Sequence, residues 1–433
     1  MKRRNTVLVV DSGGRGSVLV EKYSQSPNVD RILAVPGNDL MQVNTPKSVK
    51  IYPSLKTTDV KEIIDICKKE KVILVDVAQD DAVAMGLVNA LAQRGIPALG
   101  PTKEAGRIEW DKAWARNFMT RYRIPQPAFK VCRSAREGQL YIKKHTNQPW
   151  FVKAFGLAQG KGALPAVNNK EAIEKILEMK RFGDAGKTYL LEQWISGEEF
   201  STYAICNGVD FQIVGSAQDH KRMFNFDQGE NTGGVGSSTP ALVVTPGILK
   251  QVEEIFRKTL RGLKKEGRPY KGVLYLGGMV VKGKVYVIEF NARWGDPEAE
   301  VIIPGIENDF FDLGMAVVEG GRLKLRTDGK ARVVVTGLLN PYQTEVRVRR
   351  IYGLGKILRM KGVKVYGTRV KKVGRNYFAL SGRLFHIVGE GKDVIQARRK
   401  AYEAMSQVYI EGNNLHYRTD IGWRDVERLK NDS

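Results

Sequence analysis

The first hundred residues alternate short apolar runs with stretches of helical spacing, and this pattern constrains the fold more than any other feature. The expected strands are Val7–Val10, Ile32–Val35 and Val72–Val75. The expected helices are Val18–Ser24, Val60–Lys69 and Ala82–Arg94, the last of which ends at Gly95. Alternation of this kind is typical of a parallel sheet with helices on its faces.

Two further regions follow this unit, which the Gly-Pro-Thr at 100–102 is expected to end. The middle region holds most of the charged and glycine-rich motifs. The region from Ala331 is rich in β-branched residues and ends in a helical stretch at Val394–Tyr409. A chain of 433 residues is also longer than one hydrophobic core usually serves. We predict an α/β protein with an N-terminal parallel-sheet, Rossmann-like domain at 1–106, a central α+β domain at 107–330 and a small β-rich C-terminal domain at 331–433.

Composition narrows the classes of protein that are left. With 42% hydrophobic and 27% charged residues the chain is typical of globular proteins. No stretch approaches the roughly 18–20 apolar residues that a membrane helix needs, and the first apolar run is too short for a signal peptide. Cys67, Cys132 and Cys206 lie far apart and form no metal-ligand spacing. We therefore expect a cytoplasmic protein without a membrane partner.

The formal net charge of +23 is the one unusual bulk property. It fits a protein that binds nucleic acid, but it also fits a surface that attracts small anionic substrates. Residues 346–375 contain no acidic residue, and the alternation at 346–349 predicts a half-exposed strand. We interpret this segment as a solvated basic sheet face, so nucleic acid is not an expected partner.

The turn Ser12-Gly13-Gly14-Arg15-Gly16 lies between a predicted strand and a predicted helix. Such a turn can direct backbone N–H groups at a phosphate, helped by the N-terminus of the helix. Its spacing differs from the GxGxxG of dinucleotide-binding folds. On this pattern alone, phosphate binding and a plain tight turn are equal alternatives.

A second glycine-rich segment is more informative. A predicted strand delivers Lys153, and a loop at 156–162 then carries Lys161. Because its glycines let the backbone approach a ligand closely, such a loop suits a lid over ATP phosphates. It does not fit the GxxxxGK[ST] pattern of P-loops. Lys112, on a helical stretch upstream, would be an ordinary surface lysine by itself, but with these residues it can supply a further phosphate contact.

Glu289, Asn291 and Arg293 form the strongest motif. The first two lie two residues apart on a predicted strand and so share one face. Their oxygen atoms suit Mg²⁺ that bridges ATP phosphates. Arg293 extends the same face toward an anionic substrate or a transferring phosphoryl group. A single carboxylate on a strand is usually only solvated, whereas this aligned set is not typical of a passive surface.

Three other segments have weaker patterns. The strand at 190–195 is predicted to leave a nucleotide pocket, with backbone groups near adenine and Glu199 near a ribose hydroxyl. On the local pattern alone, an ordinary strand and loop with exposed acids is the better interpretation. The polar and basic run at 216–222 suits a carboxylate or phosphate substrate, and 230–236 is a turn rich in backbone donors. His220 is predicted to make a hydrogen bond rather than to act as a general base.

In combination and in order, these segments resemble the glycinamide ribonucleotide synthetase family over about residues 5–427. The matching segments are Pro36-Gly37-Asn38, Gly100–Lys103, Gly156–Gly162, Gln218–Arg222, Asn231–Gly236, Glu289–Glu298, Ser381–Arg383 and Asp420–Arg424. The Gln-Asp-His-Lys-Arg and Glu-Phe-Asn-Ala-Arg segments are quite specific together. The resemblance implies a pre-ATP-grasp domain, an ATP-grasp domain and a small C-terminal domain.

The resemblance also implies an ATP-dependent ligase of purine biosynthesis that joins glycine to 5-phosphoribosylamine through a glycyl phosphate. It implies ATP and Mg²⁺ or Mn²⁺ as cofactors, the two small molecules as partners, and a monomer or weak homo-oligomer. The implied catalytic residues are Asp219, Lys221 and Arg293, and the implied metal ligands are Glu289 and Asn291. The implied ATP contacts are Lys112, Lys153, Gly160, Lys161, Gly162, Glu192, Trp194, Ile195 and Glu199. The implied substrate contacts are Gly13, Gly14, Arg15, Pro36, Gly37, Asn38, Asp219, Lys221, Arg293 and Asp296.

Three departures from the family pattern lie on the sugar-phosphate side. The departing residues are Gly16-Ser17 in place of Glu-His, Val77-Ala78-Gln79-Asp80 in place of a Gly-Pro-Glu element, and Asn340-Pro341-Tyr342 in place of Tyr-Pro-Gly. They keep open a second hypothesis, an ATP-grasp ligase with the same ATP chemistry and a different amine. A nucleotide-responsive RNA-binding protein is a third hypothesis, and the intact metal and phosphate motifs argue against it.

Overall fold

The N-terminal domain is the parallel sheet that the sequence predicts. The computed structural model describes residues 5–154, 163–342 and 348–431. The strands are β1 (Thr6–Asp11), β2 (Arg31–Pro36), β3 (Ser48–Ile51), β4 (Val72–Val77) and β5 (Ala98–Leu99). They form a parallel sheet in the order β3-β2-β1-β4-β5. Its helices are α1 (Gly14–Ser24), α2 (Val60–Lys69), α3 (Asp80–Ala84) and α4 (Leu87–Ala92). The central strand β1 is buried along its length, as expected for a strand covered on both faces.

One local prediction for this domain was wrong, and two of its strands were not predicted. The expected helix at 82–94 is two short helices, because Gly86 adopts a left-handed conformation with φ of 81° between them. The edge strands β3 and β5 had no matching expectation. β5 has two residues and β3 is partly exposed, so neither produces the continuous apolar run of a buried strand.

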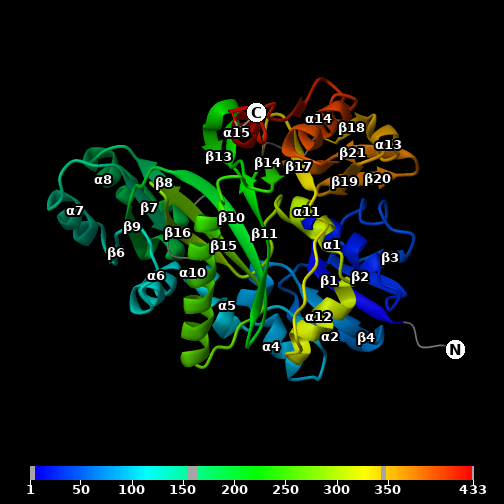
Figure 1. Cartoon of the computed structure of the whole chain (residues 1–433), viewed down its shortest axis with the longest axis horizontal. Helices are drawn as coiled ribbons and strands as arrows, with labels where there is room; N and C mark the ends of the chain where they lie inside the picture. The colour runs from blue at the N-terminus through cyan, green and yellow to red at the C-terminus, as the bar shows by residue number, and fades with distance from the viewer. Residues whose placement is uncertain (1–4, 155–162, 343–347, 432–433) are drawn as a thin grey trace.

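The central domain begins with a small antiparallel sheet and its helices. Its first elements are α5 (Lys103–Trp110), α6 (Lys112–Arg121), β6 (Phe129–Cys132), α7 (Ala135–Lys143), β7 (Trp150–Ala154), β8 (Ala163–Ala166), α8 (Asn169–Glu178), α9 (Asp184–Lys187) and β9 (Tyr189–Gln193). The sheet has the order β6-β9-β7-β8. Together with α7 and α8 it forms a lobe at the left of Figure 1, away from the N-terminal domain.

A large sheet forms the centre of the molecule. Its strands are β10 (Glu198–Asn207), β11 (Phe211–Asp219), β14 (Gly236–Thr239), β15 (Lys271–Val281), β16 (Lys284–Asn291), β17 (Ala331–Leu339), β19 (Val363–Gly367), β22 (Arg383–Gly391) and β24 (Leu415–His416). The path is β16-β15-β10-β11-β14-β17-β22-β19, and β24 pairs with β17. The associated elements are β12 (Arg222–Phe224), β13 (Gln228–Asn231), α10 (Pro246–Lys265), α11 (Ala299–Ile302) and α12 (Phe310–Glu319). Since β14 pairs with β17, the sheet runs on from the central into the C-terminal domain.

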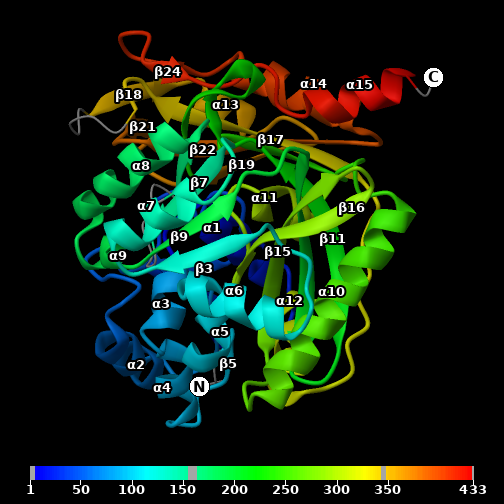
Figure 2. The same ribbon diagram turned by 90° about the vertical axis from the view of Figure 1, so that its left-hand side faces the viewer.

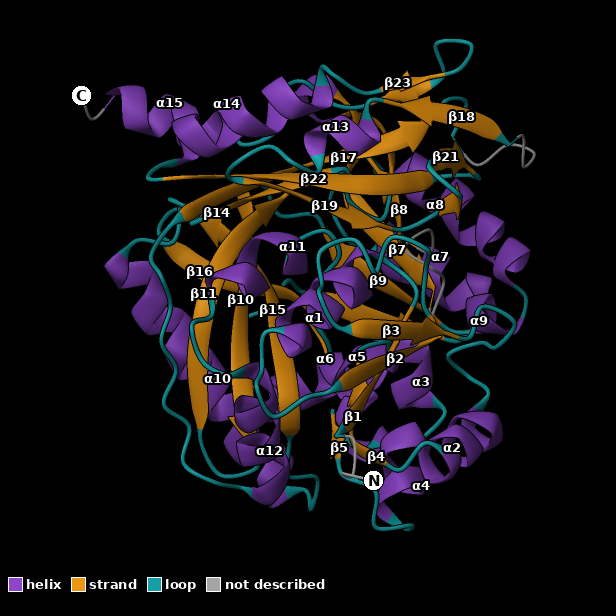
Figure 3. Cartoon of the chain, turned by 90° about the vertical axis from the view of Figure 1, so that its right-hand side faces the viewer, coloured by secondary structure: helices purple, strands orange, loops and turns teal. Residues whose placement is uncertain are grey.

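The C-terminal domain adds a second, small antiparallel sheet. Its strands are β18 (Arg349–Tyr352), β20 (Val370–Val373), β21 (Asn376–Ala379) and β23 (Tyr409–Ile410), and its helices are α13 (Leu354–Ile357), α14 (Val394–Met405) and α15 (Trp423–Asn431). This domain lies across the top of the other two in Figures 2 and 3. Of the strand expected at 346–349, residues 346 and 347 lie outside the described residues, and β18 begins at Arg349. The expected helix at 394–409 ends at Met405.

One hydrophobic core joins the three domains. It contains Val7 of β1, Tyr203 of β10 and Val334 of β17, all buried, together with Trp294. Within the described residues, no helix is both long and apolar enough to cross a membrane. The three domains therefore meet around a shared interior.

Candidate active site

Four predicted cations surround one predicted metal ligand. Lys112 begins α6, Lys153 lies on β7, Lys221 follows β11 and Arg293 follows β16, close to Glu289. Desolvation alone would raise the pKa of Glu289, but these four positive charges lower it. Lys112 is half-buried, and desolvation lowers its pKa. The sequence-predicted phosphate and metal residues are thus brought together between the two antiparallel sheets.

Lys112 is placed by the first turn of α6. Asp111 caps this helix, since its side chain accepts a hydrogen bond from the N–H of Trp114 at 2.8 Å. Asp111 is also held by Arg107 through an ion pair of 2.8 Å. The lysine therefore projects from a fixed helix N-terminus, which is itself favourable for anions.

Lys153 is held by a buried carboxylate. The Glu192 side chain on β9 pairs with Lys153 and accepts a hydrogen bond from Arg116 Nε at 2.7 Å. Burial alone would raise the pKa of Glu192, but Arg116 and Lys153 hold it at about 2. The ATP contact expected of Glu192 stays a prediction, and in this structure its side chain pairs with Lys153. Arg116 was not predicted, because a basic residue on an amphipathic helix is most often solvated.

The segment after Glu192 contributes aromatic and apolar surface. Trp194 follows β9, and its ring lies 4.8 Å from that of Phe151 in a tilted arrangement. The backbone N–H of Trp194 donates to the carbonyl of Pro149 at 3.2 Å. Ile195 is half-buried beside it. The expected contacts Gly160, Lys161 and Gly162, and the loop at 156–162 with them, lie outside the described residues.

Glu109 orients the end of the metal-ligand strand. Its carboxylate accepts from the N–H of Ala292 at 2.7 Å and pairs with Arg293 Nη2 at 3.0 Å. The same guanidinium donates to Asn291 Oδ1 at 3.3 Å. Burial raises the pKa of Glu109 to about 7, although Arg293 opposes the shift. Sequence reasoning missed Glu109, but an acidic residue on the buried face of α5, next to Ile108, is a usable signal.

The residues fit a hard divalent cation. The side chain of Glu289 is exposed and makes no hydrogen bond or ion pair within the described part of the chain. Asn291 supplies an amide oxygen next to it on the same strand face. Oxygen donors of this kind suit Mg²⁺ and Mn²⁺.

The end of β11 places two predicted catalytic residues near the cleft. Lys221 Nζ lies 3.2 Å from Glu199 Oε2, and Glu199 raises the pKa of Lys221. Glu199 was expected at a ribose hydroxyl, and here its carboxylate contacts this lysine. Asp219 Oδ1 is buried and has no hydrogen-bond partner among the described residues. Burial raises the pKa of Asp219, and the nearby charge of Glu298 adds to the shift.

His220 has the hydrogen-bonding role that the sequence suggested. Its Nε2 accepts a hydrogen bond from the N–H of Gly422 at 3.0 Å. Burial lowers the pKa of His220 to about 3, so the ring is neutral at physiological pH. The side chain therefore ties the end of β11 to the last segment of the chain.

Three backbone N–H groups of the first turn, those of Gly13, Arg15 and Gly16, already have partners. Asp11 Oδ1 accepts from the N–H groups of Gly13 at 2.5 Å and Gly16 at 3.1 Å. Asp296 Oδ2 accepts from the N–H of Arg15 at 3.3 Å. A Cβ on Gly16 would lie 2.8 Å from Asp11 Oδ1, so the carboxylate fills the space of the missing side chain. The turn expected to bind phosphate is thus liganded by the protein's own carboxylates.

Arg15 is turned into the interior. Its Nε donates to Asp11 Oδ2 at 2.7 Å, its Nη1 to the carbonyl of Trp294 at 2.9 Å, and its Nη2 to Gln79. Gln79, one of the departures from the family pattern, stabilises the turn by accepting a hydrogen bond from Arg15.

Asn38 ties the turn to the C-terminal domain. It follows Pro36 at the end of β2 and Gly37, whose φ of 74° favours glycine. The Asn38 amide nitrogen donates to the carbonyls of Ser12 and Gly367, both at 2.9 Å. Asn38 is 8% exposed, and its amide nitrogen is already used in hydrogen bonds that stabilise the fold.

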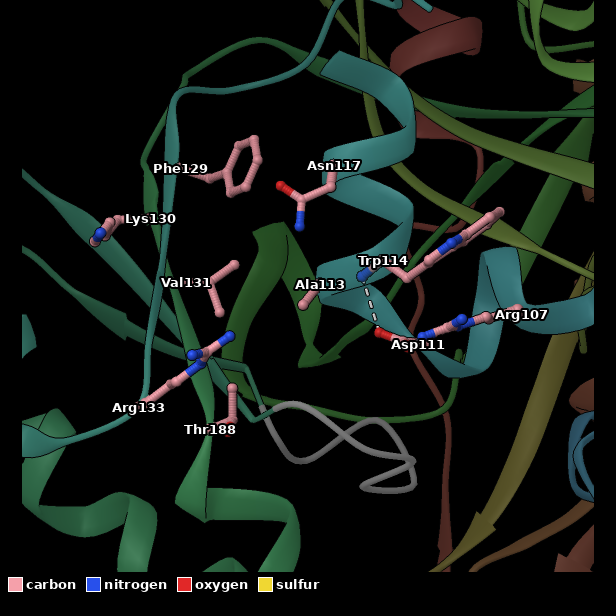
Figure 4. A pocket seen from close by; sticks show the side chains of 10 residues that line it. All are labelled: Arg107, Asp111, Ala113, Trp114, Asn117, Phe129, Lys130, Val131, Arg133 and Thr188. Carbon is pink, nitrogen blue, oxygen red and sulfur yellow. Dashed lines mark hydrogen bonds and ion pairs between the residues drawn. The ribbon is translucent and has the colours of Figure 1, made fainter. Parts of the chain in front are cut away.

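A separate cavity of about 630 Å³ opens beside α6. Figure 4 shows Phe129 and Val131 of β6 across the cavity from Asn117 and Ala113 of α6. Within the described part of the chain, no predicted site residue lines this cavity, so it is distinct from the cluster around Glu289.

The site lies between two antiparallel sheets. Each sheet contributes a lysine, and the Glu-x-Asn motif ends one strand of the larger sheet. This arrangement is characteristic of the ATP-grasp class of enzymes. The domain arrangement then identifies the branch. Three family models match: the Phosphoribosylglycinamide synthetase N domain at 5–109, its ATP-grasp (A) domain at 110–299 and its C domain at 341–424. The chain belongs to the phosphoribosylglycinamide synthetase family.

Similar proteins agree with this assignment. The phosphoribosylamine–glycine ligase of Streptococcus pneumoniae is 34% identical, over 97% of this chain and 100% of its own length. That of Chlorobaculum tepidum is 33% identical, over 96% and 99%. The crystal structure of the Thermotoga maritima enzyme superimposes with a TM-score of 0.80 at 29% identity, covering 96% of this chain and 100% of that one. A Campylobacter jejuni biotin carboxylase shares the fold, with a TM-score of 0.74 at 16% identity, over 95% and 93%.

Proposed function

We propose that this protein ligates glycine to 5-phosphoribosylamine, with conversion of ATP to ADP and phosphate and with Mg²⁺ or Mn²⁺ as the metal. The family membership and the names of the relatives support the reaction. We further propose that it acts in the cytoplasm as a monomer or weak homo-oligomer. Its domains would be 1–106, 107–330 and 331–433.

The proposed ATP site is the cluster around Glu289. Lys112 and Lys153 would neutralise phosphate oxygens, and Lys153 is held for this purpose by Glu192. Glu289 and Asn291 would hold the metal, which supplies charge neutralisation at the transferring phosphoryl group. Trp194 and Ile195 would contact the adenine.

In the first step, a glycine carboxylate oxygen attacks the γ-phosphorus of ATP, and ADP leaves. Arg293, fixed by Glu109, would stabilise the charge on the transferring group. The product is glycyl phosphate, in which the carboxyl carbon is activated. Asp219 and the nearby Glu298 offer a carboxylate environment for the ammonium group of glycine.

In the second step, the amine nitrogen attacks the acyl carbon, phosphate leaves, and the amine loses a proton. Water would hydrolyse the intermediate, so the site must be closed during the reaction. Gly13, Gly14, Asn38 and Asp296 would line the amine side.

The observation that carries the proposal is the convergence of four cations on Glu289 in a chain of this family. The test supplies glycine, ATP, Mg²⁺ and freshly generated 5-phosphoribosylamine and looks for glycinamide ribonucleotide by mass spectrometry. We expect a product that requires all four components. ADP release without this product would contradict the proposal.

A second candidate, ligation of glycine to a different amine, is favoured by one observation. Asp11 occupies the N–H groups of Gly13 and Gly16 that would otherwise receive a phosphate. An amine without a phosphate would meet less repulsion there. A coupled ADP-release assay across phosphorylated and unphosphorylated amines distinguishes the two candidates.

A further inference from the structure

Three side chains that could hold a metal gather behind the first turn. They are Asp296, Glu300 of α11 and His386 of β22, and one ligand atom from each lies within 4.8 Å of the others. His386 Nε2 lies 3.3 Å from Asp296 Oδ1 and 3.7 Å from Glu300 Oε1. Glu300 and His386 are fully buried. This cluster is separate from the Glu289 and Asn291 pair, and the proposed reaction uses neither Glu300 nor His386.

Glu300 is the anomaly in this cluster. Within the described residues neither of its side-chain oxygens has a hydrogen-bond partner, although the side chain is 0% exposed. A buried carboxylate without a partner is strongly unfavourable, so such a group calls for a compensating ligand. A Cβ on Gly14 would lie 2.2 Å from Glu300 Oε1, and the absence of that atom keeps the carboxylate in place against the turn.

His386 is oriented as metal-binding histidines are. Its Nδ1 lies 2.9 Å from Thr336 Oγ1. If Nδ1–H donates to this hydroxyl, the lone pair of Nε2 points toward the two carboxylates, and an oxygen partner on the far nitrogen is the usual support of a histidine ligand. Burial lowers the pKa of His386, so the neutral form that binds metals is favoured. Thr368 Oγ1, 3.2 Å from Nε2, is the one hydroxyl that a metal would displace.

The charges of the cluster leave room for a cation. Arg383 Nη1 lies 2.8 Å from Asp296 Oδ1 and offsets that carboxylate. Arg15 is paired with Asp11. Among the described residues, no Arg or Lys forms an ion pair with Glu300, and burial raises the pKa of this carboxyl. A cation bound at the imidazole nitrogen would compensate its charge.

We propose that Asp296, Glu300 and His386 bind a divalent transition-metal ion, such as Zn²⁺ or Mn²⁺, that joins the central domain to the C-terminal domain. One imidazole and two carboxylates suit these ions better than Mg²⁺, which takes oxygen ligands. Metal–ligand bonds of about 2.0–2.2 Å need only small shifts from the spacings present. Because Asp296 Oδ2 also accepts from the N–H of Arg15, the ion would fix the carboxylate that supports the first turn.

The test uses the full-length protein without nucleotide. Metal is removed with a chelator, Zn²⁺ is added in the presence of excess Mg²⁺, and bound zinc is counted by elemental analysis after gel filtration. We expect one zinc per chain. We expect Glu300→Gln and His386→Gln to weaken zinc binding by about 100-fold or more, and Thr336→Val by about 10-fold, since loss of a supporting group typically costs 10–100-fold. His145→Gln, which alters an exposed histidine near α7, is the matched control and should bind zinc normally.

X-ray absorption of the wild-type zinc complex provides a readout that does not depend on the folding of a variant. The expected first shell contains one imidazole nitrogen and carboxylate oxygens. Wild-type protein that takes up no zinc, a shell without imidazole, or full zinc binding by a folded Glu300→Gln protein would each overturn the proposal. In those cases a proton rather than a metal compensates Glu300. Neither measurement involves glycine or the amine, so the outcome is independent of the proposed reaction.

Discussion

Glu289 differs from Glu192 and Glu109 in making no hydrogen bond or ion pair among the described residues. Glu192 is held by Lys153 and Arg116, and Glu109 by Arg293, so both are structural supports. Glu289 is exposed, and its pKa is lowered by cations that belong to the phosphate site. A carboxylate that stays ionised and unpaired in such surroundings is available to a metal ion.

We expect Glu289→Gln to lower kcat by about 100-fold or more while the melting temperature is nearly unchanged. The substitution removes one charged metal ligand, which is worth about 3 kcal/mol or more at the transition state. Steady-state ADP release across a Mg²⁺ titration measures the effect. Glu319→Gln, an exposed residue at the end of α12, is the control. A folded Glu289→Gln enzyme with normal turnover would remove the metal assignment.

Glu109 should act through Arg293 and not on the substrate directly. In Glu109→Gln the amide can still accept from Ala292, but the ion pair that places the guanidinium is lost. A misplacement of about 1 Å typically costs up to 100-fold, so we expect kcat to fall about 10–100-fold with a small change in the KM for ATP. Glu104→Gln, exposed on the same helix, should have no effect. Equal losses in the two variants would argue against a positioning role.

The sequence predicts a site residue when other residues of the same site lie close to it in the chain. Glu289, Asn291 and Arg293 stand out because they are two residues apart along one strand. Glu109 and Arg116 were not predicted because their partners are distant in sequence: Glu109 contacts Arg293, and Arg116 contacts Glu192. No local periodicity contains that information.

At the scale of elements, the ion pairs of Glu192 join β9 to β7 and α6. Its folded pKa of about 2 lies below the ordinary value of 4.5, so the folded state binds fewer protons than the unfolded state between these values. The stabilisation is fully present above pH 4.5 and is lost as the pH falls toward 2, with a size of roughly 3 kcal/mol. The lobe that carries Lys153 therefore depends on an ionised Glu192.

We expect Glu192→Gln to lower the melting temperature clearly at pH 7, and the difference from the wild type to shrink as the pH is lowered below 4.5. Removal of one member of a buried ion pair leaves the remaining charges unmatched, which accounts for the loss at neutral pH. Glu254→Gln, at an exposed pair on α10, should change the melting temperature little at any pH. A difference that is independent of pH would mean that the Glu192 carboxylate is not ionised.

The first turn is the element in which sequence and structure diverge most. The strand and helix around it were predicted, because buried apolar runs and helical spacing are local patterns. The sequence did not predict that N–H groups of the turn donate to the carboxylates of Asp11 and Asp296. Asp296 lies 281 residues beyond Arg15 in the chain, so no local pattern contains this contact. The division of the expected helix at Gly86 has the same origin, since a left-handed glycine leaves the apolar spacing intact.

We expect Gln79→Ala to raise the KM for the amine more than it lowers kcat. Gln79 accepts from Arg15, and its loss would loosen the turn without touching the reacting atoms. Weaker ground-state binding appears in KM, whereas loss of transition-state contacts appears in kcat. Initial rates at varied amine and fixed ATP and glycine separate the two. The KM for ATP serves as the internal control and should be unchanged.

At the scale of the whole molecule, the C-terminal domain is connected to the rest of the chain by the shared core and by the continuous sheet. β14 of the central domain pairs with β17, and Asn38 and Ser17 of the N-terminal domain both bind the carbonyl of Gly367. The predicted three-domain order is present, but the sequence does not reveal that the large sheet spans two of the domains. Pairing between β14 and β17 is a long-range contact without a local signature.

The net charge of +23 should act through substrate encounter. A strongly positive molecule attracts anions and raises their association rates, and salt screens this attraction, with a Debye length of about 10 Å at 0.1 M and about 3 Å at 1 M. We therefore expect kcat/KM for ATP to fall several-fold between about 0.05 and 0.5 M NaCl. Glycine carries no net charge at neutral pH, so its kcat/KM, measured at saturating ATP in the same salt series, should change little. Equal salt dependence for the two substrates would point to an effect of salt on the enzyme itself. If only the kcat/KM for ATP depends on salt, the net positive charge acts by attracting anionic substrates. A nucleic-acid partner is then not needed to explain it.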